Sequence, residues 1–369
     1  MTSVDRRIRT LIVDDTAMYR KILSDAMRGI PEAEVVDALP SGVLALKRLE
    51  SLSVDLVLLD IFMPEMDGLE TLRQIRKKFP NICVVMISGA TTRDASITLE
   101  ALAAGALDFI AKPQVKSVQE GMQVISEALR NALRLVRLKK GLPIYDTPPV
   151  QFKITTPQPA PIKKRPLAIP PAGKFECIVI GVSTGGPNAL SVLIPKLPQK
   201  IGCPILLVQH MPAMFTASLA ERLKKVSKIN VKEAQEGESI LPDSIYIAPG
   251  GKHMVARPFF GNKEWKIGLN ENPPVNSCRP AVDVLFQSVA EIASGPVLAI
   301  ILTGMGDDGA AGVAVLKKKN CYCISQDEKS CVVYGMPRAV EERQLADEVL
   351  PLEQIAERMV TLTNGNRLF

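Results

Sequence analysis

Short apolar runs alternate with longer amphipathic stretches along the first third of the chain. The apolar runs predict five β-strands, at residues 10–13, 35–38, 55–60, 83–88 and 107–111. The segments that follow them carry apolar side chains at helical spacing, as at residues 17–28 and 68–78. Residues 56–59 are apolar without alternation, which is typical of a strand buried on both faces of a parallel sheet. The pattern predicts a five-stranded, doubly wound α/β domain.

The same pattern returns in the second half of the chain. Apolar runs at residues 178–180, 205–208, 245–247 and 298–302 predict further strands, each followed by a glycine-rich loop or a helix. A second, Rossmann-like α/β domain is therefore expected. In such sheets the functional residues gather at the carboxyl ends of the strands.

A proline-rich stretch separates the two patterns. Residues 141–174 contain nine prolines in 34 positions, and proline lacks an amide donor, so an extended linker is expected. A chain of 369 residues is also too long for one ordinary hydrophobic core. We therefore predict a first domain at residues 8–127, a helical extension and linker at 128–174, and a second domain at 175–369.

Composition narrows the class of protein. Hydrophobic residues make up 47% of the chain and charged residues 23%, as in globular proteins. No segment reads as a signal peptide or approaches the ~20 apolar residues of a membrane span, so we expect a cytoplasmic protein without membrane insertion. The net charge of +6 could suit nucleic acid or an acidic protein surface, but aromatic residues are only 4%, which gives little material for base-stacking platforms. We expect no nucleic-acid partner.

Polar residues with related chemistry follow four strands of the first domain. Asp14 and Asp15 follow the first strand, Asp60 and Ser88 end the third and fourth, and Lys112 follows the fifth. Each could be a helix cap or a solvated loop charge, but their recurrence at successive strand ends favours a shared site. Three crowded carboxylates repel unless a cation joins them, and oxygen ligands favour Mg²⁺. The set predicts transfer of a phosphoryl group onto a carboxylate.

Residues 8 to about 127 resemble a response-regulator receiver domain. The resemblance is carried by L-I-V-D-D, L-L-D-I-F-M-P-E-M-D-G and D-F-I-A-K-P. It implies that Asp60 is the phosphoacceptor and that Asp14, Asp15 and Asp60 bind Mg²⁺. It also implies that Ser88 and Lys112 contact the phosphoryl group, and that a histidine kinase of the chemotaxis system is the phosphodonor.

Two further features of this domain follow from the resemblance. The Lys112–Pro113 peptide bond is expected to be cis. Phe62 departs from the related methylesterases, which usually have Glu at this position. Because the metal contact there is a backbone carbonyl, metal binding should survive, whereas the lifetime of the phosphoryl group is left open.

A serine in a glycine-rich turn opens the second domain. Residues 181–187 read G-V-S-T-G-G-P directly after a predicted strand, which exposes the Ser183 hydroxyl beside the start of a helix. The segment alone suits a catalytic serine and a phosphate-binding loop about equally. A serine hydrolase of the triad type also needs an imidazole, and the chain has only two histidines, His210 and His253, both after predicted strands.

An acidic partner for the imidazole is expected at another strand end. The strand at 298–302 leads into T-G-M-G-D-D-G, where Asp307 and Asp308 are both available. One of them could orient the histidine while the other caps the following helix. The order Ser, His, Asp differs from that of α/β-hydrolases, so a different hydrolase fold is indicated.

Residues 175 to about 365 resemble the catalytic domain of chemotaxis protein-glutamate methylesterases. The matching segments are G-V-S-T-G-G-P, V-Q-H-M-P, I-A-P-G-G-K-H-M, R-P-A-V-D-V-L-F, L-T-G-M-G-D-D-G and C-V-V-Y-G-M-P. The resemblance implies a triad of Ser183, His210 and Asp308, with Thr184 and Met305 supporting the oxyanion. It implies hydrolysis of glutamate methyl esters on chemoreceptors and deamidation of receptor glutamines, with no cofactor for either reaction.

Two other functions of the second domain are disfavoured by the sequence. A DNA-binding regulator would need a short helical output with a basic recognition helix, and the second half is instead a long α/β pattern. An inactive receptor-binding adaptor is disfavoured because all three candidate triad residues are present. We expect the unphosphorylated first domain to lie over the Ser183 pocket and phosphorylation of Asp60 to weaken that docking.

Overall fold

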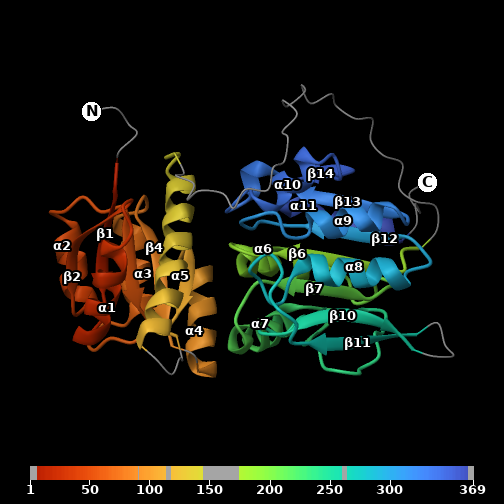
Figure 1. Cartoon of the computed structure of the whole chain (residues 1–369), viewed down its shortest axis with the longest axis horizontal. Helices are drawn as coiled ribbons and strands as arrows, with labels where there is room; N and C mark the ends of the chain where they lie inside the picture. The colour runs from red at the N-terminus through yellow and green to blue at the C-terminus, as the bar shows by residue number, and fades with distance from the viewer. Residues whose placement is uncertain (1–5, 90, 114–117, 144–173, 260–263, 365–369) are drawn as a thin grey trace.

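The computed structural model describes residues 6–89, 91–113, 118–143, 174–259 and 264–364. These residues form two α/β domains that lie side by side in Figure 1, the first coloured red to yellow and the second green to blue. The expected proline-rich linker falls almost wholly at residues 144–173, outside the described residues.

The N-terminal domain is built on a parallel sheet with the strand order β2-β1-β3-β4-β5. Its strands are β1 (Ile8–Val13), β2 (Ala33–Leu39), β3 (Leu56–Asp60), β4 (Cys83–Ser88) and β5 (Asp108–Ala111). Its helices are α1 (Ala17–Arg28), α2 (Gly42–Leu49), α3 (Gly68–Lys78), α4 (Thr92–Ala103) and α5 (Val118–Lys139). Every residue of β3 and β4 is buried, because helices cover both faces of the sheet. The predicted five-stranded fold is confirmed.

Helix α5 continues past the boundary predicted at residue 127. It runs unbroken from Val118 to Lys139, and Leu129, Leu133 and Val136 are buried in the core of the N-terminal domain. The apolar face of this helix is therefore part of the first domain along its whole length. The helical extension expected from residue 128 therefore begins as the second half of α5.

The C-terminal domain holds a larger parallel sheet with the order β14-β13-β12-β6-β7-β9-β8. Its strands are β6 (Cys177–Val182), β7 (Ile205–Gln209), β8 (Asn230–Glu233), β9 (Ser244–Ile247), β12 (Val297–Ile301), β13 (Cys321–Gln326) and β14 (Glu348–Leu350). An antiparallel pair, β10 (His253–Pro258) and β11 (Trp265–Asn270), stands apart from this sheet. The predicted strands appear as β6, β7, β9 and β12, and the remaining ones were not predicted.

Six α-helices accompany the described part of the larger sheet. They are α6 (Gly186–Leu193), α7 (Ala213–Val226), α8 (Val282–Ile292), α9 (Ala310–Lys317), α10 (Met336–Glu342) and α11 (Leu352–Thr363). Strands β6 and β7 occupy the middle of the sheet, and β12 lies on the other side of β6. The carboxyl ends of these three strands therefore meet in one place. None of the described helices is both long and apolar enough to cross a membrane.

Candidate active site and phosphoacceptor pocket

Ser183 follows β6 directly and precedes α6. Its backbone N–H donates to the Thr303 carbonyl (3.0 Å), which ties the serine to the loop after β12. Gly185 has φ of +78°, a conformation that side chains rarely adopt, so a glycine suits the turn into α6. Gly304 allows close approach as well, because a Cβ placed there would lie 2.8 Å from the Ser183 Cβ. The two glycines let the serine turn sit against the neighbouring loop.

His210 occupies the matching position on the next strand. Val182 of β6 pairs with Gln209 of β7, so Ser183 and His210 are the residues that follow at the two adjacent strand ends. The buried Gln209 side chain donates from Nε2 to the Ser183 carbonyl (2.9 Å) and to the His210 carbonyl (3.2 Å). One amide therefore links the backbones of both candidate residues.

Asp308 provides the acidic partner of the imidazole. His210 Nε2 lies 2.8 Å from Asp308 Oδ2, and both side chains are largely buried. Asp308 also accepts backbone N–H groups from Val282, Asp283 and Gly309, two of them at the start of α8. Burial alone would raise the pKa of the Asp308 carboxyl, but these hydrogen bonds and the imidazole outweigh it and lower the pKa.

The alternatives left open by the sequence are placed elsewhere. The Asp307 carboxylate is exposed and forms a salt bridge with Arg343 (2.6 Å). His253 is buried, with Nδ1 accepting the Ala281 N–H (3.2 Å) and Nε2 lying 3.1 Å from the Pro273 carbonyl. Both ring nitrogens of His253 are therefore bonded to backbone groups, which indicates that this histidine stabilises the fold.

The environment of His210 favours its protonated form. Burial lowers the pKa of the imidazole, but the hydrogen bonds to Asp308 and to Cys278 outweigh burial and raise the pKa to about 9. Cys278 Sγ lies 3.5 Å from Nδ1, the ring nitrogen that does not face Asp308. The ring is thus held on both sides. Within the described contacts, the Ser183 hydroxyl makes no hydrogen bond to His210.

Thr184 and Met305 lie in the two loops that border Ser183. Thr184 lines the same cavity as Ser183 and His210, and its carbonyl accepts the Thr303 hydroxyl (3.0 Å). The Met305 side chain packs against the hydrophobic cluster that includes Val333 of its own domain together with core residues of the N-terminal domain. Neither backbone N–H donates to another residue in the described ranges, so both amides are available to an oxyanion.

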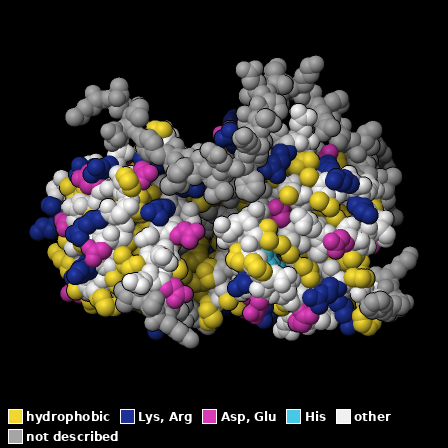
Figure 2. Space-filling view, viewed as in Figure 1, with side chains coloured by type: hydrophobic (Ala, Val, Ile, Leu, Met, Phe, Trp, Pro, Cys, Tyr) yellow, Lys and Arg dark blue, Asp and Glu magenta, His cyan; other side chains and the backbone are white. Residues whose placement is uncertain are grey.

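The N-terminal domain closes one side of this site. A cavity of about 250 Å³ is lined by Ser183 and His210 from one domain and by residues 105–109 from the other. Helix α4 packs on α6 and α7, and Asn188 Nδ2 donates to the Leu102 carbonyl (2.8 Å). Hydrophobic side chains gather in the furrow between the domains in Figure 2. The first domain therefore borders the Ser183 pocket, and its blocking of access in the unphosphorylated state stays a prediction.

An aromatic pair fastens the same interface. The rings of Phe109 and Phe215 stack with their centroids 4.4 Å apart, joining the start of β5 to α7. Asp108, the residue before Phe109, also lines the cavity. Burial raises the pKa of the Asp108 carboxyl to about 6, although the Phe109 N–H partly offsets this.

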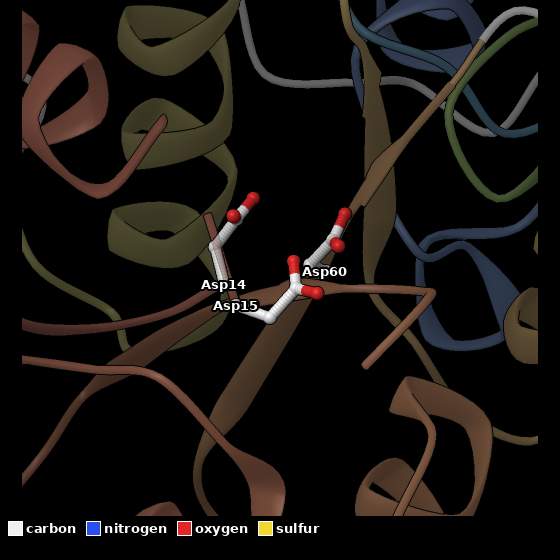
Figure 3. A group of neighbouring side chains, drawn as sticks. All are labelled: Asp14, Asp15 and Asp60. Atoms are coloured by element: carbon white, nitrogen blue, oxygen red, sulfur yellow. The ribbon is translucent and has the colours of Figure 1, made fainter. Parts of the chain in front are cut away.

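The N-terminal domain brings three carboxylates together at the carboxyl ends of β1 and β3. Figure 3 shows Asp14, Asp15 and Asp60 converging, and one oxygen of each lies within 4.8 Å of the others. Burial raises the pKa of the Asp60 carboxyl to about 6, Lys112 opposes the rise, and the charges of Asp14 and Asp15 add to it. The oxygen-rich donor set fits a hard divalent cation such as Mg²⁺.

Lys112 and Ser88 border this pocket in different ways. Lys112 Nζ bridges Asp60 Oδ1 (2.7 Å) and Asp14 Oδ2 (3.1 Å), so it lies where a phosphoryl group on Asp60 would need a positive charge. The Ser88 hydroxyl instead bonds Thr98 Oγ1 of α4 (2.7 Å) and lies 3.1 Å from the Gly89 carbonyl. Its contact with a phosphoryl group stays a prediction.

Two expectations for this pocket have separate outcomes. Among the described residues the cis peptide bond is Arg279–Pro280, so the expectation of a cis Lys112–Pro113 bond was wrong; the trans form is the one that proline intrinsically prefers. Phe62 is partly exposed, and the Arg93 guanidinium lies 5.4 Å from its ring centroid. The side chain at this position thus meets α4 through a cation–π contact.

Four residues that the sequence patterns do not identify complete the candidate site. They are Gln209, Asn276, Cys278 and Asp283, which contact Ser183, His210 or Asp308 directly. Gln209 could have been suspected, since it directly precedes His210 at the strand end. The others lie outside the predicted strand ends, where hydrophobic periodicity gives no signal.

Comparisons with known proteins agree with this architecture. The response regulator receiver domain family matches residues 10–125, and the CheB methylesterase family matches residues 178–359. A protein-glutamate methylesterase/protein-glutamine glutaminase from Desulfotalea psychrophila is 44% identical, over 96% of this chain and 98% of its own length. Its counterpart from Halalkalibacterium halodurans is 41% identical, over 97% and 99%.

A solved structure covers the second domain. The methylesterase catalytic domain of CheB from Thermotoga maritima is 43% identical and aligns with a TM-score of 0.50, over 52% of this chain and 100% of that one. Full-length relatives and a solved catalytic domain thus agree with the two-domain structure described above. The chain belongs to the protein-glutamate methylesterase/protein-glutamine glutaminase family, with an N-terminal response regulator receiver domain and a C-terminal CheB methylesterase domain.

Proposed function

We propose that this protein is a phosphorylation-activated methylesterase that hydrolyses glutamate methyl esters on chemoreceptors during chemotaxis adaptation. It also deamidates specific receptor glutamines by the same chemistry. The observation that carries the proposal is the His210–Asp308 pair, placed one strand end away from Ser183 at the centre of the sheet. The receptor enters as substrate, and the acidic surface of receptor methylation helices suits a chain with net charge +6.

The proposed reaction is acyl transfer through Ser183. The serine oxygen attacks the γ-carbonyl carbon of the ester, and His210 takes the hydroxyl proton. Since Nε2 faces Asp308, Nδ1 is the nitrogen that acts as the base. Asp308 stabilises the resulting imidazolium, and the free amides of Thr184 and Met305 stabilise the oxyanion.

The intermediate then breaks down in two steps. His210 returns its proton to the departing methoxide, so methanol leaves and a glutamyl ester of Ser183 remains. Water attacks that ester with His210 again as base, which releases the glutamate and regenerates the serine. In deamidation only the leaving group differs, because ammonia departs in place of methanol. The chain's own residues supply each of these proton transfers without a cofactor.

Phosphorylation of the receiver domain controls this site. We assign Asp60 as the phosphoacceptor, with Asp14, Asp15 and Asp60 holding Mg²⁺ and Lys112 and Ser88 contacting the phosphoryl group. A divalent cation held there would offset the crowded negative charge of these carboxylates. A histidine kinase of the chemotaxis system is the phosphodonor. Because Ser88 bonds Thr98 of α4, and α4 packs on the catalytic domain, a change at Ser88 can reach the interface.

The working units follow from this division of labour. We propose a receiver unit that begins near residue 8 and reaches through 127 along α5, a linker that ends near 174, and a catalytic unit at 175–369. The protein acts in the cytoplasm, where the signalling parts of chemoreceptors and their kinase are found, and it neither inserts into the membrane nor binds nucleic acid.

A methanol-release assay on methylated receptor membranes tests the proposal. The wild-type chain should release methanol, and a small phosphodonor should stimulate that release. Ser183→Ala should abolish release and leave phosphorylation of Asp60 intact, because the two sites lie in different domains. Substantial release by the Ser183→Ala protein would refute the assignment of the nucleophile.

A further inference from the structure

Two buried carboxylates lie side by side at the catalytic site. Asp308 accepts the N–H groups of Val282 and Asp283 at the start of α8. Asp283 plays the same part at the next helix, because its Oδ1 accepts the N–H groups of Gly309 (3.0 Å) and Gly312 (2.6 Å) at the start of α9. Asp308 therefore caps α8, the helix that carries Asp283, and Asp283 caps α9, the helix that follows Asp308.

This pairing places like charges close together. Burial raises the pKa of the Asp283 carboxyl, the amide of Gly312 opposes the rise, and the charge of Asp308 adds to it. If Asp283 and Asp308 came to share a proton, Asp308 would lose part of the charge that stabilises an imidazolium on His210. The site therefore needs donors that hold both carboxylates in their ionised forms.

One side chain donates to both carboxylates. Asn276 Nδ2 lies 2.8 Å from Asp308 Oδ1 and 2.9 Å from Asp283 Oδ2, so its two amide hydrogens can serve the two groups. Among the described contacts of Asp283 and Asp308, Asn276 is the side chain that donates to both carboxylates. The remaining donors are backbone amides and His210.

The backbone around Asn276 is shaped to present this amide. Val275 and Cys278 exchange hydrogen bonds of 3.1 and 2.9 Å, and the two residues between them both have positive φ, +52° at Asn276 and +60° at Ser277. A type I′ turn requires this combination, and Asn is favoured at its first central position. The same turn carries Cys278, whose Sγ lies 3.5 Å from His210 Nδ1.

We propose that Asn276 is a positioning residue for the His210–Asp308 pair, holding the Asp308 carboxylate in place and keeping it and Asp283 ionised. The inference rests on the proposed roles of His210 and Asp308. Loss of the amide should slow the activation of Ser183 by about 10- to 100-fold, the scale of lost hydrogen bonds to charged groups near a reacting centre. It should also change the dependence of the rate on pH.

Three variants separate the amide from the turn. Asn276→Gly removes the amide and keeps a residue that accepts positive φ. Asn276→Asp keeps the shape and replaces a donor with a third acid. Ser277→Gly is the matched control, because it alters the neighbouring position of the same turn, relieves its positive φ and leaves the amide in place.

The readout is the rate at which a fluorophosphonate modifies Ser183 in the full-length chain, with a phosphodonor present, from pH 5 to 10 (a range chosen to span ordinary His titration). In this reaction the serine oxygen bonds phosphorus, fluoride leaves, and the hydroxyl proton passes to His210. No receptor is needed, so the readout does not depend on the substrate. Melting temperatures of all variants show whether a change in rate merely follows a change in stability.

The titratable groups that face Asn276 define the expected profiles. They are Asp283 and Asp308, which Asn276 contacts directly; beyond them lie His210, bonded to Asp308, and Cys278, which contacts His210, whereas Asp307 faces outward to Arg343. The wild-type rate should rise with pH as His210 loses its proton. The Asn276→Asp rate should instead pass through a maximum and fall at higher pH, because the added acid can donate only while it is protonated.

The outcomes distinguish the inference from the function on which it rests. Slowed labelling of Asn276→Gly, wild-type labelling of Ser277→Gly and an acid-shifted optimum for Asn276→Asp would support the role of Asn276. Wild-type rates and pH profiles in both Asn276 variants would overturn that role while leaving the nucleophile assignment intact. Equal labelling of wild type and Ser183→Ala would overturn both.

Discussion

The two domains crowd carboxylates at the ends of parallel strands, and they neutralise the crowding differently. In the receiver, burial and neighbouring carboxylates raise the pKa of Asp60 to about 6 despite Lys112. In the catalytic domain, Asp308 accepts five hydrogen bonds and its pKa is lowered, although Asp283 lies beside it. The receiver pocket therefore keeps an excess of negative charge, whereas in the catalytic domain hydrogen bonds from the protein itself stabilise the charge of Asp308.

This difference matches the chemistry that each pocket performs under our proposal. Backbone N–H groups at the start of α8 and the Asn276 amide hold the Asp308 charge permanently, so it can stabilise each imidazolium that forms. Asp60 instead needs partners that bind reversibly, namely a divalent cation and a phosphoryl group. A carboxylate balanced by fixed amides suits catalysis, whereas one that depends on bound ions suits a switch.

The largest effect should come from removing the base. His210→Ala should lower methanol release by about 10⁴-fold or more, the scale of losing a triad histidine. His253→Ala should retain far more activity, because both His253 ring nitrogens are bonded to backbone groups. Steady-state rates and melting temperatures for the two variants provide the measurement. The reverse order of losses would show that the base has been misassigned.

A smaller loss is expected when the acidic partner loses its charge. Asp308→Asn should lower turnover by about 10³- to 10⁴-fold, because an amide favours the wrong tautomer of His210. Asp307→Asn is the matched control at the adjacent position, where the carboxylate is exposed and bonded to Arg343. Its effect on turnover should be slight. Equal and mild losses in the two proteins would mean that neither aspartate orients the imidazole.

The pH dependence should report the balance of charge around His210. Only the neutral ring can accept the serine proton, so kcat/KM should rise with pH, by about tenfold per unit below the pKa. Since the pKa of His210 is raised to about 9, the midpoint should lie well above the ordinary value of 6.5. Asp308→Asn should move the midpoint down. A wild-type midpoint at or below 6.5 would contradict this electrostatic picture.

Removal of divalent cations separates the two pockets most directly. A chelator should abolish stimulation by a phosphodonor, because the carboxylates of Asp14, Asp15 and Asp60 would lose the cation that offsets their charge. Basal hydrolysis should change by less than about twofold, since hydrogen bonds alone balance Asp308. The comparison is made in one preparation, with Mg²⁺ restored as the control. Loss of basal hydrolysis would show that the catalytic site also depends on a metal.

Much of the fold could be predicted because buried parallel strands need uninterrupted apolar runs. Strand β4 was predicted with its observed bounds, Cys83–Ser88, and both α1 and α3 match residues 17–28 and 68–78. Strand β13 was not predicted, since its sequence C-Y-C-I-S-Q mixes polar and apolar residues although all are buried. The β10–β11 pair lies outside the parallel pattern altogether.

The residues of the candidate site that directly follow strands could be predicted from the sequence, and the others could not. Ser183, His210 and the aspartate pair follow strands, so topology brings them together. The orientation of Asp307 and Asp308 depends on the loop and on the α8 amides, so residue type alone left both open. Asn276 lies in a turn defined by positive φ angles, and neither periodicity nor strand position identifies such a residue.

We propose that the receiver limits access to Ser183 and that phosphorylation of Asp60 relieves the block. The interface that it depends on joins Asn188 to Leu102 and Phe109 to Phe215 beside the cavity. The direct test measures methanol release from methylated receptors by the full-length chain, by its Asp60→Asn variant, and by a fragment that begins near Phe175.

The fragment should be faster than the unphosphorylated full-length chain, and a phosphodonor should stimulate the wild type but not Asp60→Asn. A tenfold difference would need a shift of only about 1.4 kcal/mol in the docking equilibrium. A fragment no faster than the unphosphorylated whole would contradict occlusion, and the receiver would then have to act by direct activation or by recruitment to the receptor.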